Sequence, residues 1–210
     1  MSIYVAAFAL SYLIGSFPTA YFVVKRNTQK DIRSLGSGNV GGMNAYEVTG
    51  NKFVGILVVG IDALKGIVVV LAVKLLISSA VGVVIVGMTA GIIGHCYPVW
   101  LKFHGGRGLA IGAGMLLVTT WIFVAVWLVM WWIGNKLSKN VHVANVAATL
   151  TAPVIVALIP KKVVELTFAG NVAAAEMMSA YFCIAVIILL RHIEPIRVLF
   201  RRNDTTIKLD

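Results

Sequence analysis

Charged residues are scarce in this chain, and acidic residues are the scarcest of them. Only 12% of the 210 residues are charged, with 8 acidic against 18 basic side chains, whereas 60% are hydrophobic. A soluble domain usually carries about 25% charged residues. The composition therefore excludes an ordinary soluble domain and predicts a polytopic membrane protein.

Cysteines are also few, and the basic excess is confined to particular segments. Cys96 and Cys183 lie in or beside hydrophobic runs without the spacing of metal ligands, so we expect buried free thiols and no metal site. The net charge of +10 comes from Lys and Arg between and after the hydrophobic runs, as in cytoplasmic loops beside anionic lipid. We therefore expect the lipid bilayer as a partner and no nucleic acid. No internal repeat divides residues 1–210, so a single domain is predicted, and the oligomeric state is left open.

Hydrophobic runs long enough to cross a bilayer recur along the chain. The spans expected outside the 109–135 region are Ile3–Val24, Phe53–Ile77, Val81–Val99, Val141–Ile159 and Ala173–Leu190. Lys25 and Arg26 directly follow the first run and place the N-terminus outside. That run has no basic region before it and no clear cleavage site, so we expect it to remain as an anchor, kinked at Pro18.

The run Leu109–Asn135 reads as one long span, but a single crossing conflicts with the charge distribution. It would leave Lys136 and Lys139, and eventually the C-terminal arginines, outside. Splitting the run near Thr119 into a short helix and a second span removes the conflict. The prediction is an all-α membrane helix bundle of about seven membrane helices including one short half-helix. Its N-terminus lies outside and its C-terminus is cytoplasmic.

A polar, glycine-rich loop over residues 34–44 follows the first span. It contains Gly36, Gly38, Gly41 and Gly42 together with Ser37, Asn39 and Asn44, and Lys30 and Arg33 lie just before it. Glycine permits positive φ and close backbone approach, so successive N–H groups can face one anion. Nearby basic side chains would strengthen phosphate binding. The loop is a candidate phosphate cradle, with an ordinary turn as the alternative.

A second polar group follows the span Val81–Val99. It consists of His95 at the helix end and the loop Gly105, Gly106, Arg107 and Gly108 on the same membrane face. His95 could act as a general base because the pKa of an unperturbed imidazole lies near neutrality. A structural, hydrogen-bonded histidine is the alternative. The loop is a second candidate anion site.

Asp62 and Lys65 lie inside the hydrophobic span Phe53–Ile77. Three residues apart on a helix, they share one face and can neutralise each other. Ionisable residues at membrane depth point to function. A structural ion pair inside the bundle is the alternative.

Several motifs, taken in order, resemble the acyl-phosphate-dependent glycerol-3-phosphate acyltransferases of bacterial membranes. They are Gly15-Ser16-x-Pro18, Gly36-Ser37-Gly38-Asn39-Val40-Gly41-x-x-Asn44, Asp62-x-x-Lys65-Gly66, Gly94-His95-x-Tyr97-Pro98-Val99 with Gly105-Gly106-x-Gly108, and Arg191-His192. The resemblance covers nearly the whole chain, and several motifs in one order are more specific than any one alone.

The resemblance implies transfer of a fatty acyl group from acyl phosphate to the 1-hydroxyl of glycerol 3-phosphate, with no cofactor, metal or acyl carrier. The products would be lysophosphatidic acid and phosphate, made at a cytoplasm-facing site in the cell membrane. The catalytic residues expected are His95, Ser37 and Asn44. The residues expected to bind the substrate phosphates are Arg33, Ser37, Gly38, Asn39, Gly41, Gly105, Gly106, Arg107, Gly108 and His192.

The chain departs from the family pattern at several positions, which keeps other functions open. Met43 replaces the usual Thr, Glu47 an Arg, and Pro195 an Asn, while His104 and Arg107 stand where the family carries lysines. His142 and Asn145 occupy a segment that contains Ser in the family. The alternatives are a divergent member with another phosphorylated donor or acceptor, and a phosphate-binding membrane protein without catalysis.

Overall fold

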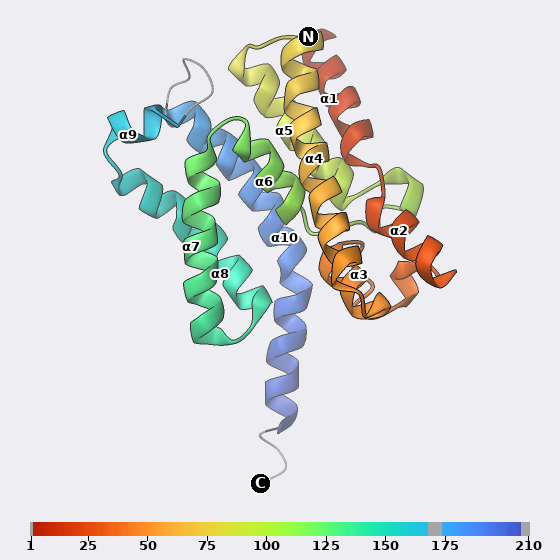
Figure 1. Ribbon diagram of the computed structural model, residues 1–210. Helices are drawn as coiled ribbons and strands as arrows, with labels where there is room; N and C mark the ends of the chain where they lie inside the picture. Colours follow the sequence, from red (N-terminus) through yellow and green to blue (C-terminus); the bar gives the residue numbers. More distant parts are fainter. Residues whose placement is uncertain (1, 168–173, 207–210) are drawn as a thin grey trace.

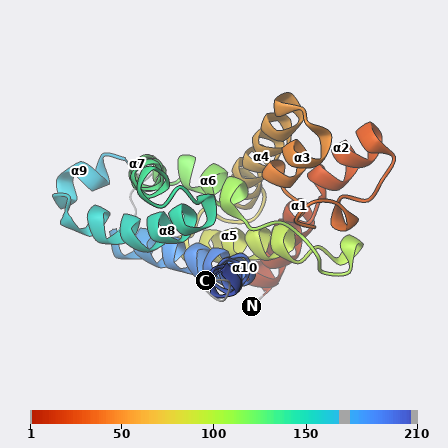
Figure 2. The ribbon, with the colours of Figure 1, turned by 90° about the horizontal axis from the view of Figure 1, so that it is seen from below.

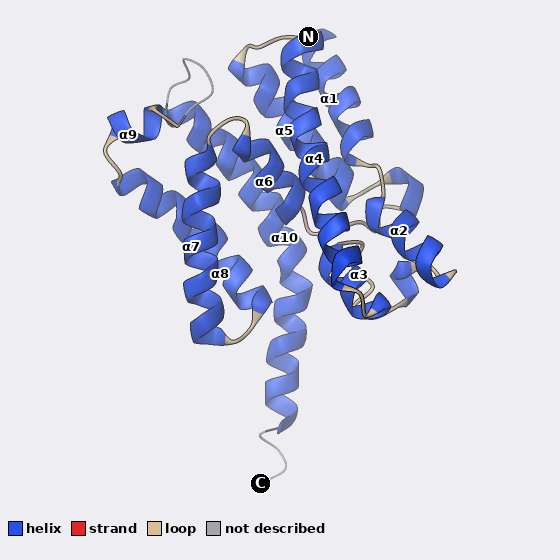
Figure 3. Ribbon diagram, in the orientation of Figure 1, coloured by secondary structure: helices blue, strands red, loops and turns tan. Residues whose placement is uncertain are grey.

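The computed structural model describes residues 2–167 and 174–206, and this part of the chain consists of helices and loops without strands (Figure 3). The helices are α1 (Ser2–Gly15), α2 (Thr19–Thr28), α3 (Gly42–Thr49), α4 (Lys52–Leu76), α5 (Val81–Cys96), α6 (Leu109–Leu117), α7 (Trp121–Ser138), α8 (Val141–Leu158), α9 (Lys161–Glu165) and α10 (Ala174–Thr206), with the 3-10 turns η1 (Ile32–Ser34) and η2 (Val99–Leu101). The all-α prediction is confirmed for the described residues.

Two groups of helices flank a central pair (Figure 1). Helices α1, α4 and α5 form one group, α7 and α8 the other, and α6 and α10 lie between them. The core is apolar and includes the completely buried side chains of Val69, Ile92, Ile111 and Met115. Because lipid gives no hydrophobic drive for helix association, close van der Waals packing has to hold the bundle together.

Small residues allow this packing at the helix crossings. A Cβ atom at Gly66 of α4 would overlap the Ile111 carbonyl of α6, and one at Gly94 of α5 would overlap the Tyr12 carbonyl of α1. These contacts fix α6 against α4, and the loop that leads into α6 lies beside the loop before α3, where a Cβ atom at Gly106 would be 2.9 Å from the Val40 carbonyl oxygen.

Within the residues that the structure describes, five segments are long and apolar enough to cross a membrane, so the protein is a multi-pass membrane protein. They are Ser2–Thr28, Lys52–Leu76, Val81–Leu101, Trp121–Ser138 and Val141–Leu158. These bounds agree to within a few residues with four of the spans expected from the sequence and with the second part of the split run, because hydrophobic run length is a local property of the chain. The expected span Ala173–Leu190 is not among the five.

The predicted split of the 109–135 run is confirmed. Helix α6 ends at Leu117 and α7 begins at Trp121. The hydroxyl of Thr119 donates a hydrogen bond of 3.0 Å to the Met115 carbonyl and thus satisfies one of the last carbonyls of α6. Helix α6 is too short to cross alone, and its neighbours α4, α5 and α10 shield it.

Two expectations need correction. Pro18 does more than kink the first helix, because α1 ends at Gly15 and α2 starts at Thr19. The carbonyls of Gly15 and Phe17 then accept from Lys65 Nζ at 3.3 and 2.7 Å. Helix α10 continues well beyond the predicted end at Leu190, to Thr206, and passes through Pro195. The short helices α3 and α9 were not expected from the sequence.

Candidate active site

A polar cavity of about 460 Å³ lies at the end of the bundle where the loop before α3 meets α6 and α8. Figure 2 views the molecule from this end. The cavity is lined by Asn39, Gly41, Gly42, Met43, Val59, Asp62, His95, Arg107, Gly108, Leu109, Ala110, Trp127, Leu128, Trp131, Val141, His142 and Asn145. It therefore brings together the two glycine-rich loops that the sequence placed on one membrane face.

The N-termini of α3 and α6 both face this cavity. Gly41 and Gly108 precede these helices, and neither helix has a side-chain cap. Gly108 has a φ of 86°, which favours glycine. The first N–H groups of a helix have no partner within it, and the helix dipole makes this end positive. Two uncapped N-termini in one cavity are an arrangement that favours anions.

Arg107 adds a full positive charge and contacts His142. Its Nη1 lies 3.4 Å from His142 Nδ1. Because a guanidinium only donates, His142 accepts at Nδ1 and carries its proton on Nε2. Burial lowers the pKa of Arg107, Arg191 lowers it further and Glu47 opposes the shift. An arginine pKa starts so far above neutrality that the side chain stays charged.

His95 also lines the cavity and is held by the buried pair Asp62 and Lys65. Lys65 Nζ is 2.9 Å from Asp62 Oδ1 and 3.4 Å from His95 Nδ1, and Asp62 Oδ1 is 3.9 Å from the same ring nitrogen. An ammonium group only donates, so Nδ1 accepts and the ring proton sits on Nε2. This geometry favours His95 as a hydrogen-bond donor over the general base expected from the sequence. Asp62 and Lys65 thus form a buried pair that also orients a site residue.

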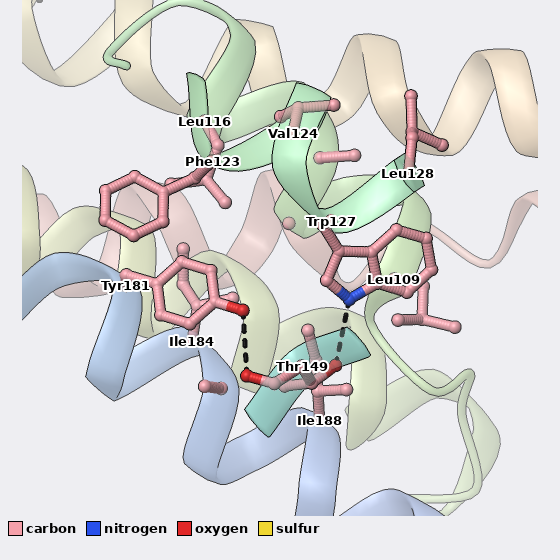
Figure 4. A pocket seen from close by; sticks show the side chains of 13 residues that line it. Leu109, Leu116, Phe123, Val124, Trp127, Leu128, Thr149, Tyr181, Ile184 and Ile188 are labelled. Atoms are coloured by element: carbon pink, nitrogen blue, oxygen red, sulfur yellow. Dashed lines mark hydrogen bonds between the residues drawn. The ribbon is translucent and has the colours of Figure 1, made fainter. Parts of the chain in front are cut away.

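A smaller apolar cavity of about 80 Å³ adjoins the polar one and shares Leu109, Trp127 and Leu128 with it. Figure 4 shows that its walls come from α6, α7, α8 and α10. Trp127 Nε1 donates to Thr149 Oγ1 at 3.0 Å, and the Tyr181 hydroxyl donates to the Thr149 carbonyl at 2.9 Å. Since these polar groups are paired with each other, the surface of the cavity is almost entirely apolar.

Comparison with known proteins assigns the chain to a family. The family model described as glycerol-3-phosphate acyltransferase matches residues 5–202. The chain belongs to the glycerol-3-phosphate acyltransferase family. The glycerol-3-phosphate acyltransferase of Staphylococcus aureus (strain JH9) is 34% identical over 207 residues, which is 95% of each chain. The resemblance stated from the motifs is thereby confirmed.

Two solved structures are similar to this acyltransferase over 94% of its chain and 92% of theirs, each with 27% sequence identity. They are PlsY (YgiH), an integral membrane glycerol 3-phosphate acyltransferase, in its glycerol 3-phosphate form and in its lysophosphatidic acid form. The TM-scores are 0.76 and 0.72. The helix arrangement described above is therefore the integral membrane fold of this family.

The first glycine-rich loop of this acyltransferase is organised around Asn44. Asn44 is 1% exposed, and its Nδ2 donates to the carbonyls of Ile32, Leu35 and Asn39 at 3.4, 3.1 and 3.0 Å. Its Oδ1 accepts from the Ser37 N–H at 3.0 Å. All polar atoms of the side chain are thus used within the protein. This geometry gives Asn44 a scaffold role in place of the expected catalytic one.

The N–H groups expected to cradle phosphate in this loop are also occupied. Ser37 donates to Asn44, Gly38 to the Leu35 carbonyl at 2.9 Å and Gly41 to the Asn39 carbonyl at 3.1 Å. The donors open to the cavity are instead those at the start of α3. Ser37 and Gly38 do not line the cavity, whereas Asn39 and Gly41 do.

Arg33 does not line the cavity either. Its Nη2 forms an ion pair of 2.6 Å with Asp31, and its Nη1 donates to the Leu101 carbonyl at 3.0 Å. The hydrogen bond from Arg33 holds the pKa of the Asp31 carboxyl below its usual range. Arg33 therefore joins the first loop to η2, in place of the expected phosphate contact.

Gly105 and Gly106 also shape the site through their backbone. Their N–H groups donate to the carbonyls of Cys96 and His95 at 3.2 and 3.1 Å. The carbonyls of Gly105 and Gly106 themselves accept hydrogen bonds from Arg191 at 2.9 and 3.0 Å. A Cβ atom at Gly106 would overlap the His95 ring. In the second loop, Arg107 and Gly108 are the expected phosphate-binding residues that line the cavity.

The sequence did not single out His142, Asn145 and Trp131 as site residues, yet all three line the cavity. A signal for two of them was available, because His142 and Asn145 are polar residues three apart at the start of an apolar helix. His192 was expected to bind phosphate, but it is completely buried and contacts Asn145.

Proposed function

We propose that this protein transfers a fatty acyl group from acyl phosphate to the 1-hydroxyl of glycerol 3-phosphate, giving lysophosphatidic acid and phosphate. The observation that carries the proposal is the pairing of cavities. A cavity that holds Arg107 under two helix N-termini adjoins an apolar one, and the two share Leu109, Trp127 and Leu128 in their walls. Such a site suits two phosphate-bearing substrates of which one also carries an acyl chain.

The phosphate groups are proposed to bind at the start of α3 and α6, beside Arg107. Backbone N–H groups and a guanidinium both donate, and phosphate oxygens accept. His95 and His142, which both line the cavity, add Nε2–H donors under the tautomers assigned above. Ser37, Gly38 and Asn44 serve by fixing the loop that carries α3. Arg33, Gly105 and Gly106 contribute in the same indirect way.

The acyl chain is proposed to run from the polar cavity into the apolar one. Gly112 and Ala113 line the α6 side there, and Ile184 and Ile188 line the α10 side. Burying each methylene contributes about 0.8 kcal/mol. The chain thereby fixes the acyl carbonyl at the junction of the two cavities, where the acceptor hydroxyl can meet it.

In the proposed reaction the 1-hydroxyl oxygen attacks the acyl carbonyl carbon, and the bond from that carbon to the phosphate oxygen breaks. The hydroxyl proton leaves with the phosphate, so atoms and charges balance without a covalent enzyme intermediate. Holding both groups in reactive geometry supplies much of the rate enhancement. The donors around the phosphates stabilise the charge that develops on the leaving group.

The membrane arrangement proposed is of about seven membrane helices in a single domain, with the short α6 as the half-helix. The protein is proposed to lie in the plasma membrane, with its N-terminus outside the cell and its C-terminus in the cytoplasm. The support is the position of Lys25, Lys102, Lys136 and Arg191, which all fall on the side of the polar cavity in this arrangement. The site then faces the cytoplasm.

Purified protein in detergent, given acyl phosphate, tests the function. We expect phosphate release that depends on glycerol 3-phosphate, together with lysophosphatidic acid, and no product from acyl-CoA or acyl carrier protein. Folded protein that gives no product at any acyl-phosphate chain length would contradict the proposal.

A further inference from the structure

The side chain of His192 has a single consistent hydrogen-bonding pattern. His192 is completely buried on α10, and its Nδ1 lies 2.8 Å from the Ile188 carbonyl oxygen. A carbonyl only accepts, so Nδ1 carries a proton. No carboxylate in the described part of the chain forms an ion pair with this ring, and an unpaired buried charge is costly. The ring is therefore neutral, with a lone pair on Nε2.

This lone pair fixes the orientation of Asn145 on α8. Asn145 Nδ2 lies 3.2 Å from His192 Nε2, and only the NH₂ end of an amide can donate to it. The Oδ1 atom must then turn away from His192. Asn145 lines the polar cavity, and Oδ1 receives no hydrogen bond from the residues that the structure describes. Asn145 thus presents an acceptor to the cavity.

A hydrogen-bond acceptor in the cavity wall does not favour phosphate binding. The N-termini of α3 and α6 and the guanidinium of Arg107 all donate, and His142 donates through Nε2. The carboxylate of Asp62 also lines the cavity, but its Oδ1 is already paired with Lys65 Nζ at 2.9 Å. A dianionic phosphate has only acceptor oxygens and would repel the Asn145 oxygen. A hydroxyl can donate to it. The Asn145 oxygen therefore recognises the part of the substrate that carries hydroxyl groups.

We propose, resting on the proposed function, that Asn145 Oδ1 accepts a hydrogen bond from the 2-hydroxyl of glycerol 3-phosphate. His142 and Asn145 are three residues apart on α8, so their Cβ atoms lie about 5–6 Å from each other. A phosphate on carbon 3 beside His142 and Arg107 brings the hydroxyl of carbon 2 next to Asn145. The 1-hydroxyl is left free to attack. Asn145 is thereby a specificity residue, and His192 is a positioning residue that holds its amide.

The proposal predicts an order among acceptors that differ only at carbon 2. 3-Hydroxypropyl phosphate lacks the 2-hydroxyl and leaves the Asn145 oxygen unpaired. Dihydroxyacetone phosphate places a carbonyl oxygen there, which would face the Asn145 oxygen. We expect kcat/KM to fall about ten- to a hundredfold from glycerol 3-phosphate to 3-hydroxypropyl phosphate, and further for dihydroxyacetone phosphate.

The experiment compares these three acceptors in the wild type and in variants, with acyl phosphate as donor. Asn145→Leu keeps the approximate volume and removes the acceptor, so the preference for glycerol 3-phosphate over 3-hydroxypropyl phosphate should shrink to within about threefold. His192→Phe releases the amide and should lose the same preference with little change in the KM for acyl phosphate. Thr151→Val alters an exposed hydroxyl on the same helix and should keep the wild-type preference.

The outcomes separate this proposal from the proposed function. A wild type that acylates glycerol 3-phosphate and 3-hydroxypropyl phosphate equally well overturns the role of Asn145 and leaves the function standing. The same holds if Asn145→Leu keeps the full preference. A wild type that acylates none of the three acceptors overturns the function itself. If Asn145→Leu does not accumulate, Asn145→Ala replaces it, and the wild-type comparison remains decisive by itself.

Discussion

Replacing Asn44 by alanine separates a scaffold from a catalytic residue. The side chain makes three hydrogen bonds of 3.0–3.1 Å, to the carbonyls of Leu35 and Asn39 and from the N–H of Ser37, and a longer one to Ile32. Each net hydrogen bond is worth about 0.5–1.5 kcal/mol, and more if its buried partner stays unsatisfied. Asn44→Ala should therefore lower the free energy of unfolding by about 2–4 kcal/mol.

For a chain of this length, such a loss corresponds to a fall in melting temperature of about 5–15 °C. Of the two cysteines expected to be buried, Cys96 is completely buried but Cys183 is only partly buried. In a Cys183→Ser background, a thiol-reactive dye can follow unfolding in detergent, because Cys96 becomes reactive only when the bundle opens. Asn27→Ala is the matched control, since Asn27 makes an exposed hydrogen bond to the Val23 carbonyl. Its melting temperature should stay within about 2 °C of the wild type.

Activity measured below the melting temperature completes the test. A scaffold residue gives a variant that is unstable and loses activity as it unfolds, with stability and activity partly restored by substrate. If Asn44→Ala melts like the wild type and yet has no turnover, the scaffold account is refuted, and Asn44 acts on substrate.

Three further predictions follow from the same geometry. Gly106→Ala places a methyl group against His95, so turnover should fall at least tenfold while the protein still accumulates in the membrane. Steady-state kinetics on membrane preparations with equal amounts of protein would measure this fall. Gly112→Ala puts a Cβ atom 3.1 Å from Ile184 and should shift the acyl-phosphate preference towards shorter chains, whereas an unchanged chain-length profile would place the acyl group elsewhere. In cysteine-accessibility labelling, position 136 should react only from the cytoplasm and position 79 only from outside, and the reverse result at Lys136 would contradict the proposed orientation.

The spans and the split of the 109–135 run could be predicted from the sequence because both depend on local properties. Hydrophobic run length sets where a helix can cross, and the basic residues Lys136 and Lys139 decide whether α6 and α7 are one span or two. The two glycine-rich loops were recognisable for the same reason. Their glycine content shows that their backbone can approach an anion closely, and their basic residues show that both loops lie on the same membrane face.

Which atoms of these loops face the cavity could not be predicted, because side-chain hydrogen bonds within the folded loop decide it and composition alone does not reveal them. Asn44 folds back over the loop and takes the Ser37 N–H, and Arg33 is neutralised by Asp31 two residues away. The donors left for an anion are those of helix α3, which the sequence did not reveal. The eight residues of α3 carry three with weak helix propensity, Gly42, Asn44 and Thr49, so packing against α4 stabilises the helix.

The positions of His142 and Asn145 also depend on packing between distant segments. Helix α8 places them at the cavity only because it packs between α7 and α10, where His192 contacts Asn145. In sequence they appear as two polar residues at a helix start, which is equally common at a solvated end. Their pairing with Arg107 and His192 needs the folded chain.

The rate of lysophosphatidic acid formation in Arg107→Gln tests the central claim most directly, namely that the cavity beneath α3 and α6 holds the reacting phosphates. Losing a charge-assisted hydrogen bond costs about 1.5–3 kcal/mol, which is roughly ten- to a hundredfold in kcat/KM. Arg26→Gln on the exposed face of α2 removes the same charge away from the cavity and should keep wild-type kcat/KM. Equal, near-normal kcat/KM in both variants, in folded protein, would contradict the account and place the site elsewhere.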